Sequence, residues 1–302
     1  MTPAEIGAEG ADASLPSVFS DPRYVRAMAS AAGLTVHEIP AAGTLTARRR
    51  GPVTEVVLPP LTPFSGVRVP VPLGESDVHK AQDALSQTAA ELESRFSRLR
   101  IHLPPGVNDV RPLQWRGWRV SPLYTYVCDP ADGMANASSG ARRTLKKEAG
   151  GFDLVGDAAL LPEIVQLVLA GYDRSGSEGP VGAGPLGRAA KALIDHGMAE
   201  CVGIRNQEGL QAGIVLLHGA EASYYWMAGS RPGPAMTVLV AHALERLASR
   251  GVRRFDFVGA NTPPIAEFKR RLGARLDTYW SATWENGLTR RLGGLKQAVR
   301  GR

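Results

Sequence analysis

The chain has 302 residues, of which 44% are hydrophobic and 21% are charged, values typical of a globular protein with a packed core. Its two cysteines, Cys128 and Cys201, form no close pair, which argues against a disulfide scaffold or a structural zinc site. The net charge of +6 permits attraction to RNA, a nucleotide or an anionic membrane, but it serves solubility equally well. No apolar run reaches the roughly 18 residues of a membrane span and the N-terminus is unlike a signal peptide, so a cytoplasmic protein is expected.

The first part of the chain is predicted to combine two helices with short strands. Asp21 as an N-cap and Pro22 in the first turn predict a helix over 22–32. Apolar residues at three- and four-residue steps predict a long helix over 75–97. Strands are predicted at 45–48, 55–58, 67–71, 98–103 and 118–128, where Pro122 indicates an edge or a bulge.

A polar stretch of small residues over 129–139 predicts a seam, followed by a basic helix over 140–149. Beyond the seam, helices are predicted at 158–172, 185–196 and 236–249, with another that ends at Phe268. Strands are predicted at 199–204, 213–217, 223–227, 254–258 and 278–284. This order predicts an α+β fold with a mixed sheet, because strands and helices do not alternate regularly.

The sequence lacks several motifs that would indicate other chemistries. No G-x-G-x-x-G lies between a strand and a helix, and no G-x-x-x-x-G-K-[ST] occurs, so dinucleotide and P-loop nucleotide sites are excluded. None of the six histidines forms a close metal-binding pair, and no G-x-S-x-G nucleophile elbow is present. Neither a metal site nor a serine nucleophile is supported.

Two spaced motifs in the second half carry the functional information. The sequence Phe-Asp-Phe-Val-Gly at 255–259 is followed by Phe-Lys-Arg-Arg-Leu-Gly at 268–273, after an aromatic strand over 224–226. This segment resembles the Fem-type (FemAB- and FemX-like) aminoacyltransferases, relatives of the GNAT N-acetyltransferases that contain two copies of that fold. The basic helix, with Arg142, Arg143 and Lys146, resembles the family's Arg-Arg-x-x-x-Lys helix, and the segments 58–66 and 114–126 resemble its first module.

The resemblance implies two tandem GNAT-like modules, each a mixed, mostly antiparallel sheet flanked by helices. The first module is predicted over 15–135 on the acceptor side, and the second over 136–288 on the donor side. Residues 289–302 form a basic C-terminal tail, which is either an RNA-backbone contact or a frayed end.

The resemblance also implies amide-bond formation by transfer of an amino acid from an aminoacyl-tRNA to an amine on a cell-wall precursor, a peptide or a specialised metabolite. The aminoacyl-tRNA is then a co-substrate, and neither a further cofactor nor a metal is expected. The first alternative is an acyl-CoA-dependent N-acyltransferase. Its pyrophosphate loop would lie at 230–235, where Arg231 stands one position too close and Pro234 removes an N–H donor. The second alternative is a non-catalytic relative that binds RNA or another ligand.

Lys269 and Asp256 are the predicted catalytic residues. Attack of an amine on an ester carbonyl produces an oxyanion, which a fixed cation such as Lys269 stabilises more than it stabilises the ground state. Without the motif, Lys269 would be read as a solvated helix residue. Asp256 is predicted to orient the amine or a neighbouring cation, but a structural carboxylate with a buried partner fits the sequence as well.

The remaining predicted site residues fall into two groups. The aromatic residues bind the acceptor or relay protons, although they would serve equally as core residues, and Phe268 is predicted to pack beneath the site. The substrate-binding group is Phe268, Tyr224, Tyr225, Trp226, Tyr124 and Asn261. The group that contacts tRNA or phosphate is Arg142, Arg143, Lys146, Arg231 and Arg270, for which a solvated basic face is the alternative.

Overall fold

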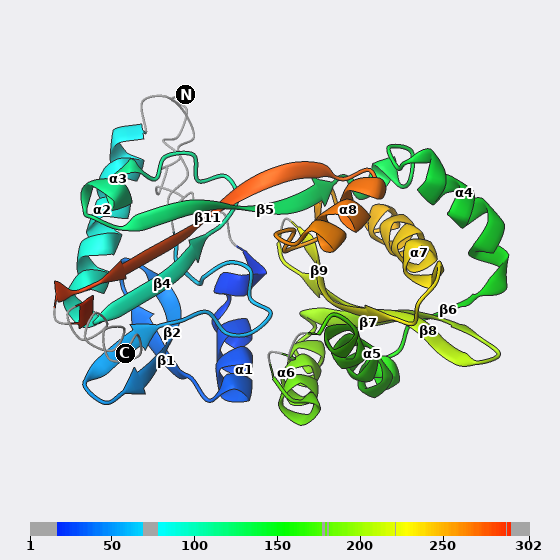
Figure 1. The fold of residues 1–302 in the computed structure, drawn as a ribbon, viewed down its shortest axis with the longest axis horizontal. Coiled ribbons are helices and arrows are strands. Elements are labelled where there is room, and N and C mark those ends of the chain that lie inside the picture. The colour runs from blue at the N-terminus through cyan, green and yellow to red at the C-terminus, as the bar shows by residue number, and fades with distance from the viewer. Residues whose placement is uncertain are drawn as a thin grey trace, which may run out of the picture.

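The computed structural model describes residues 17–68, 78–176, 179, 181–220, 222–287 and 289–290. These residues form two lobes that lie side by side and are bridged by two long strands, β5 (Arg119–Cys128) and β11 (Arg275–Glu285) (Figure 1). The other elements of the first lobe are η1 (Val18–Ser20), α1 (Pro22–Ala32), β1 (Thr35–Ile39), β2 (Gly43–Arg50), β3 (Val53–Val56), α2 (Val78–Arg95), β4 (Arg98–Leu103) and α3 (Arg111–Trp115).

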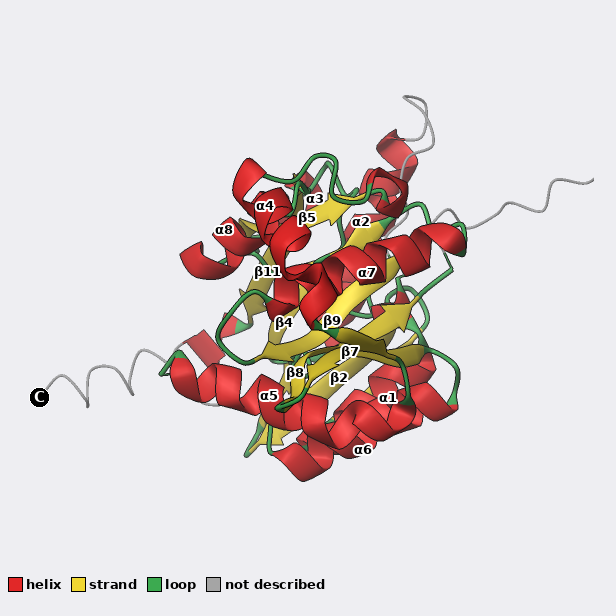
Figure 2. Ribbon diagram, turned by 90° about the vertical axis from the view of Figure 1, so that its right-hand side faces the viewer, coloured by secondary structure: helices red, strands yellow, loops and turns green. Residues whose placement is uncertain are grey.

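The second lobe contains the helices and strands that lie between β5 and β11 in the chain. They are η3 (Pro130–Asp132), α4 (Ser139–Glu148), η4 (Ala149–Gly151), β6 (Asp153–Val155), η5 (Ala158–Leu160), α5 (Leu161–Arg174), α6 (Ala183–Asp195), β7 (Ala199–Asn206), β8 (Gly209–His218), β9 (Ser223–Ser230), α7 (Ala235–Ser249), β10 (Phe255–Asp256) and α8 (Pro263–Arg271). In Figure 2, α1, α5 and α6 lie below the strands of this lobe, and α4, α7 and α8 lie above them.

The described strands form one 11-stranded sheet in the order β1-β2-β3-β4-β11-β5-β10-β9-β8-β7-β6. Its pairs are antiparallel except β3 with β4 and β10 with β9. The predicted mixed, mostly antiparallel α+β fold is therefore confirmed. The sheet is continuous across the predicted seam, because β11 inserts between β4 and β5 and pairs with both. The module boundaries stay predictions, and the tail beyond Arg290 lies outside the described residues.

Local signals explain why several elements form where they were predicted. Asp21 caps α1 by accepting a hydrogen bond from the Arg23 N–H at 2.8 Å, and Gly33 ends the helix at a φ of 64°. Helix α7 and strand β4 also occur as predicted. Pro122 pairs with Trp280 of β11 in a part of β5 that has no other paired neighbour, so its missing N–H interrupts no ladder.

Other elements differ from the predictions. The short elements β1, α3 and β6 were not predicted, and β10 is only two residues long. Within the predicted strand 67–71, Val67 forms a single bridge with Gly43, and residues 69–71 lie outside the described part of the chain. Strands β6 and β10 depend on pairing with segments distant in the sequence, which local sequence does not encode, whereas β1 pairs with the neighbouring strand β2.

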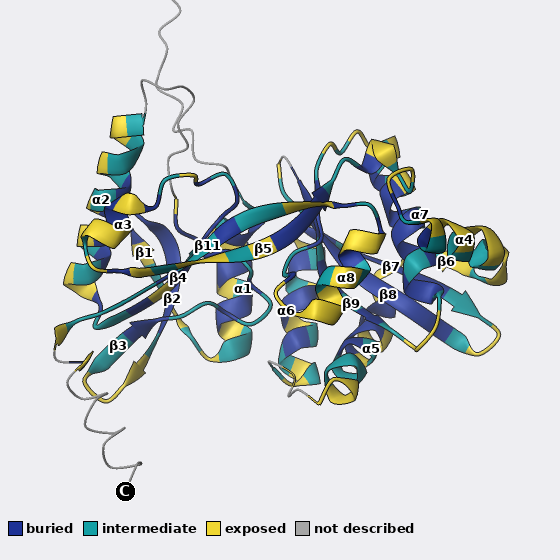
Figure 3. Ribbon diagram, turned by 45° about the horizontal axis from the view of Figure 1, so that its top comes forward, coloured by how far each residue is buried: buried dark blue, intermediate teal, exposed yellow. Residues whose placement is uncertain are grey.

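The core is built from three hydrophobic clusters, and one of them joins the lobes. Tyr24 of α1 packs edge-on against Trp226 of β9 with ring centroids 6.0 Å apart. The Trp226 indole N–H donates to the Leu61 carbonyl at 2.9 Å. Figure 3 shows that the central strands of the second lobe are buried along most of their length. The two lobes are therefore held together by packed aromatic contacts as well as by the shared sheet.

Candidate functional site

The side chain of Lys269 is buried where α8 meets the end of β10. Its exposed fraction is 4%. The ammonium Nζ donates to the carbonyl of Phe257 at 2.7 Å and also to the carbonyls of Val258 and Gly259. Three successive carbonyls converge on one atom because Val258 and Gly259 have φ angles of 40° and 54° and turn the chain sharply. The ammonium of the motif lysine thus donates to all three carbonyls of the turn 257–259.

Burial lowers the pKa of Lys269 to about 7, and the carboxylate of Asp256 acts in the opposite direction. The three carbonyl acceptors also favour the charged form. The ring centroid of Tyr225 lies 5.8 Å from Nζ, a distance at which an aromatic face attracts a cation. An incoming substrate oxygen must therefore replace one of the three carbonyls to reach the ammonium, and the predicted catalytic role stays a prediction.

Asp256 is the second buried charged group of this junction, with an exposed fraction of 1%. Its Oδ1 accepts hydrogen bonds from Thr125 Oγ1 at 2.5 Å and from the Val258 N–H at 2.8 Å. The Arg254 guanidinium lies 3.8 Å from its Oδ2. Burial raises the pKa of Asp256, whereas its hydrogen bonds and the cations Arg254 and Lys269 lower it.

Val258 links the two predicted catalytic residues through its backbone. Its N–H binds Asp256 and its carbonyl binds Lys269. A positive φ is strained for a β-branched residue, by about 1–3 kcal/mol, and persists only where the surroundings fix it. The strained turn is therefore held from both ends by buried charged side chains, an arrangement that is common at functional sites.

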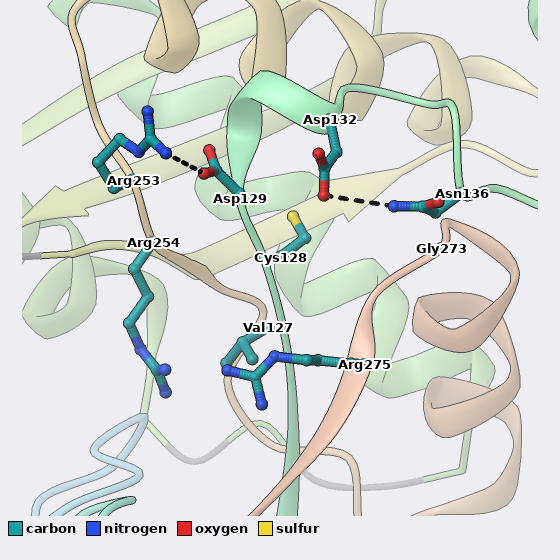
Figure 4. Close-up of a pocket in the computed structure, with 9 residues that line it drawn as sticks. All are labelled: Val127, Cys128, Asp129, Asp132, Asn136, Arg253, Arg254, Gly273 and Arg275. Carbon is teal, nitrogen blue, oxygen red and sulfur yellow. Dashed lines mark hydrogen bonds and ion pairs between the residues drawn. The ribbon is translucent and has the colours of Figure 1, made fainter.

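A pocket of about 690 Å³ lies between the lobes on the face of the sheet that carries Asp256. Its charged lining residues are Arg254, Asp256, Arg275 and Asp277, and its walls include Phe64, Tyr224, Trp280 and the loop 104–108. Arg254, which precedes β10, and Arg275 of β11 also line an adjoining pocket of about 280 Å³ (Figure 4).

Four residues of this site were not predicted from the sequence: Arg254, Arg275, Asp277 and Thr125. Strand alternation places Arg254 with Asp256, and Arg275 with Asp277, on common faces of their strands, which was a usable signal. Their assembly around one pocket was not predictable, because it requires β11 to pair with β5.

Most of the predicted substrate-binding residues lie around this junction. Asn261 Oδ1 accepts from the Tyr124 N–H at 2.9 Å, and its amide donates to the Tyr279 hydroxyl at 3.1 Å. Phe268 is partly buried against the core cluster beside α7, as its predicted packing role requires. Tyr224 lines the larger pocket, on the face of β9 opposite to Tyr225. These residues come from β5, β9, α8 and the loop before α8.

Trp226 is the exception in this group. It is 5% exposed and holds Leu61 and Tyr24 across the lobe interface. Its position is explained by packing between the lobes, away from the residues that line the larger pocket.

The predicted phosphate-binding cations are not gathered into one cluster. Arg142 donates to the carbonyls of Ala135 and Ala137, and thereby ties α4 to the seam loop. Arg270 pairs with Glu267 at 2.8 Å on the solvent side of α8. Arg231 makes a long contact of 3.4 Å with the Leu210 carbonyl. These three arginines have local protein partners.

Arg143 and Lys146 differ from the other predicted cations. Both are exposed on α4, and neither forms an ion pair with any residue that the structure describes. They remain available for an anionic partner. Within the same described residues, no helix is long and apolar enough to cross a membrane, and no three His, Cys, Asp or Glu side chains are placed to hold a metal ion.

Comparison with known proteins places this site in a recognised fold. Residues 133–270 match the acetyltransferase (GNAT) domain family. The crystal structure of FemX is similar over 87% of this chain and 92% of that chain, with a TM-score of 0.67 and 12% identity. L-PGS from Bacillus licheniformis is similar over 94% of this chain and 98% of that chain, with a TM-score of 0.57 and 11% identity. A comparison with curated proteins found no match.

At these identities the structural likenesses concern the fold, whereas the family match concerns the segment from the seam loop to α8. That segment contains β9, α7, β10 and most of α8, and so includes both Asp256 and Lys269. The chain therefore contains a GNAT acetyltransferase domain over residues 133–270, and its two-lobed fold is similar to that of FemX.

Proposed function

We propose that this acyltransferase moves an amino acid from an aminoacyl-tRNA to an amine acceptor and forms an amide bond. The observation that carries the proposal is the junction itself, where the buried cation Lys269 and the buried acid Asp256 hold one strained turn beside a pocket of about 690 Å³. The motifs at this turn are those that resemble the Fem-type enzymes. The exposed cations Arg143 and Lys146 support a polyanionic donor.

The proposed reaction assigns separate roles to the two charged groups. The acceptor amine enters from the pocket side, where Asp256 orients it and takes up its proton, since a raised carboxyl pKa suits a proton acceptor near neutral pH. The amine nitrogen forms a bond to the ester carbonyl carbon. The carbon–oxygen bond to the ribose then breaks, and the proton passes to the departing ribose oxygen.

Lys269 acts on the oxyanion that precedes this cleavage. Its charge lies in a site with little water, where electrostatic stabilisation is stronger than in solution. The substrate oxygen takes the place of one carbonyl of the turn 257–259, and the other two keep the ammonium in position.

Acyl-CoA is the competing donor, because the family match is to an acetyltransferase domain. The loop before α7 has Gly233 at a φ of 134°, and the helix begins without a side-chain cap. Its first N–H groups are therefore open to an anion. Pro234 removes one N–H at this position, which weakens the binding of a pyrophosphate there.

The donor is tested by incubating the protein with total aminoacyl-tRNA, labelled in the amino acid, and a cell extract that supplies acceptors. We expect consumption of at least one aminoacyl-tRNA above the rate of spontaneous hydrolysis. The variant with Arg143→Gln and Lys146→Gln should bind tRNA more weakly. The slope of the logarithm of its tRNA-binding constant against the logarithm of salt concentration should be shallower by about 1–2, because about two phosphate contacts are lost.

The matched control is Lys191→Gln with Arg188→Gln on α6, which removes two charges from another helix. Equal tRNA affinity for the α4 and α6 variants would contradict the assigned tRNA contact. Acyl transfer that requires acyl-CoA and ignores charged tRNA would replace the proposed donor with the competing one.

A further inference from the structure

The four charged residues of the larger pocket differ in how many ionic partners they have. Arg254 lies between two carboxylates, at 3.0 Å from Asp277 and 3.8 Å from Asp256. Asp277 is fixed in place, because its Oδ1 also accepts from the Thr278 N–H at 2.9 Å. One guanidinium is therefore shared by two carboxyl groups, so acidic side chains outnumber basic ones around Arg254.

Arg275 is the second arginine of the larger pocket. It makes no ion pair or side-chain hydrogen bond with any residue that the structure describes, and it lines both pockets. Strand β11 fixes its position, since Arg275 pairs with Val127 of β5. Figure 4 shows its side chain reaching past Val127. A guanidinium with five free donors is suited to bind a carboxylate through two parallel hydrogen bonds.

The remainder of the lining is largely apolar. Phe64, Val107 and Trp280 contribute to it, and the Trp280 indole N–H donates to the Val107 carbonyl at 2.8 Å, which anchors the loop 104–108 to β11. A ligand that fills the pocket therefore needs an apolar body as well as charged groups.

We propose that the acceptor is a zwitterionic amino compound, an amino acid or a short peptide, which binds with its ammonium at Asp256 and Asp277 and its carboxylate at Arg275. Its side chain lies against Phe64 and Trp280. This inference rests on the proposed function and deepens it, since it names the substrate class of the acceptor pocket. An amine that lacks a carboxylate, such as an amino sugar, would leave Arg275 without a partner.

The test measures binding without any donor. Phenylalanine and the dipeptide Ala-Phe are titrated into the full-length protein by calorimetry, each beside its C-terminal amide and its N-acetyl derivative. We expect the free form of at least one probe to bind about tenfold or more tightly than either derivative, because each derivative removes one charge-assisted contact.

The variant Arg275→Ala isolates the carboxylate contact. It should bind the free form and the amide of that probe equally, while it continues to discriminate against the N-acetyl derivative. The control is Arg50→Ala, an exposed arginine at the end of β2, which should bind all forms as the unaltered protein does. Circular dichroism melting curves of both variants establish that the fold is retained.

Three results would overturn the inference: no binding of any probe at millimolar concentration, equal binding of free and amidated probes to the unaltered protein, or an undiminished preference in Arg275→Ala. Because the titration contains neither tRNA nor acyl-CoA, it succeeds or fails independently of the donor. A failed donor assay with successful titration would refute the proposed transfer and leave the zwitterion site standing.

Discussion

Replacement of Lys269 by Met should lower kcat for amide formation by about 100- to 1000-fold, the effect of removing one oxyanion donor. Methionine keeps an unbranched side chain in the buried space but supplies no charge. The three carbonyls of the turn 257–259 lose their donor, so the free energy of unfolding should also fall by about 1–3 kcal/mol. Single-turnover transfer and urea unfolding measure the two effects separately.

The pH dependence of stability provides a second readout. The pKa of Lys269 is about 7 in the folded protein and near 10.5 when the side chain is free. The native state therefore binds fewer protons than the unfolded state between these values, and stability from this group rises with pH. The unaltered protein should gain stability relative to Lys269→Met as the pH increases from 7 to 10.

The control for these measurements is Lys191→Met on α6, where the lysine is exposed and pairs with Asp195 at 2.8 Å. It should change neither kcat nor the free energy of unfolding by a measurable amount. If Lys269→Met retained kcat within twofold, Lys269 would have only the structural role of holding the turn 257–259.

Replacement of Gly273 by Ala should lower the free energy of unfolding by about 2–5 kcal/mol, the sum of a left-handed backbone penalty and a steric clash. Gly273 has a φ of 87°. A Cβ there would lie 2.4 Å from the carbonyl carbon of Asn136 and 2.6 Å from the nitrogen of Ala137. The glycine that closes the Phe-Lys motif is thus required for close packing between the end of α8 and the seam loop.

Gly251→Ala is the matched control for this substitution. Gly251 has a φ of 76°, and a Cβ there would have no neighbour within 4 Å. It should cost only the backbone penalty of about 1–2 kcal/mol. If urea unfolding gave equal losses for the two variants, the proposed clash with the seam loop would be wrong.

The packing at Gly273 also has a functional consequence. The Ser138 N–H donates to the Arg271 carbonyl at 2.9 Å, beside the same contact. The end of α8 is therefore attached to the segment that begins α4. A shift of this attachment would displace Lys269, which lies one turn earlier on α8.

The sequence predicted elements whose boundaries are set by local chemistry. The cap at Asp21 and the αL glycine Gly33 define α1, and alternating burial defines β4. The fold class also followed, since the order of helices and strands is a property of the chain alone. The insertion of β11 between β4 and β5 was not predictable, because it depends on pairing between residues 148 to 187 positions apart.

The candidate site was predicted only in part. The motifs located Asp256 and Lys269, but Lys269 stands beside Arg270 and Arg271 in the sequence, and nothing local showed that it is the buried one. Arg254, Arg275 and Asp277 could not be associated with Asp256 until the pairing of β5, β10 and β11 was known. The sequence therefore indicated the chemistry at the turn, whereas the structure identified the pocket beside it.

The chemical nature of the transferred label tests the proposed aminoacyl transfer most directly. The protein is incubated with tRNA charged with radioactive amino acids and with zwitterionic acceptors, and the products are then exposed to mild base. Aminoacyl esters hydrolyse under these conditions and amides do not. We predict enzyme-dependent label in a base-stable product of higher mass than the free amino acid. Recovery of all the label as free amino acid, with base-stable product formed only when acyl-CoA is supplied, would contradict transfer from aminoacyl-tRNA.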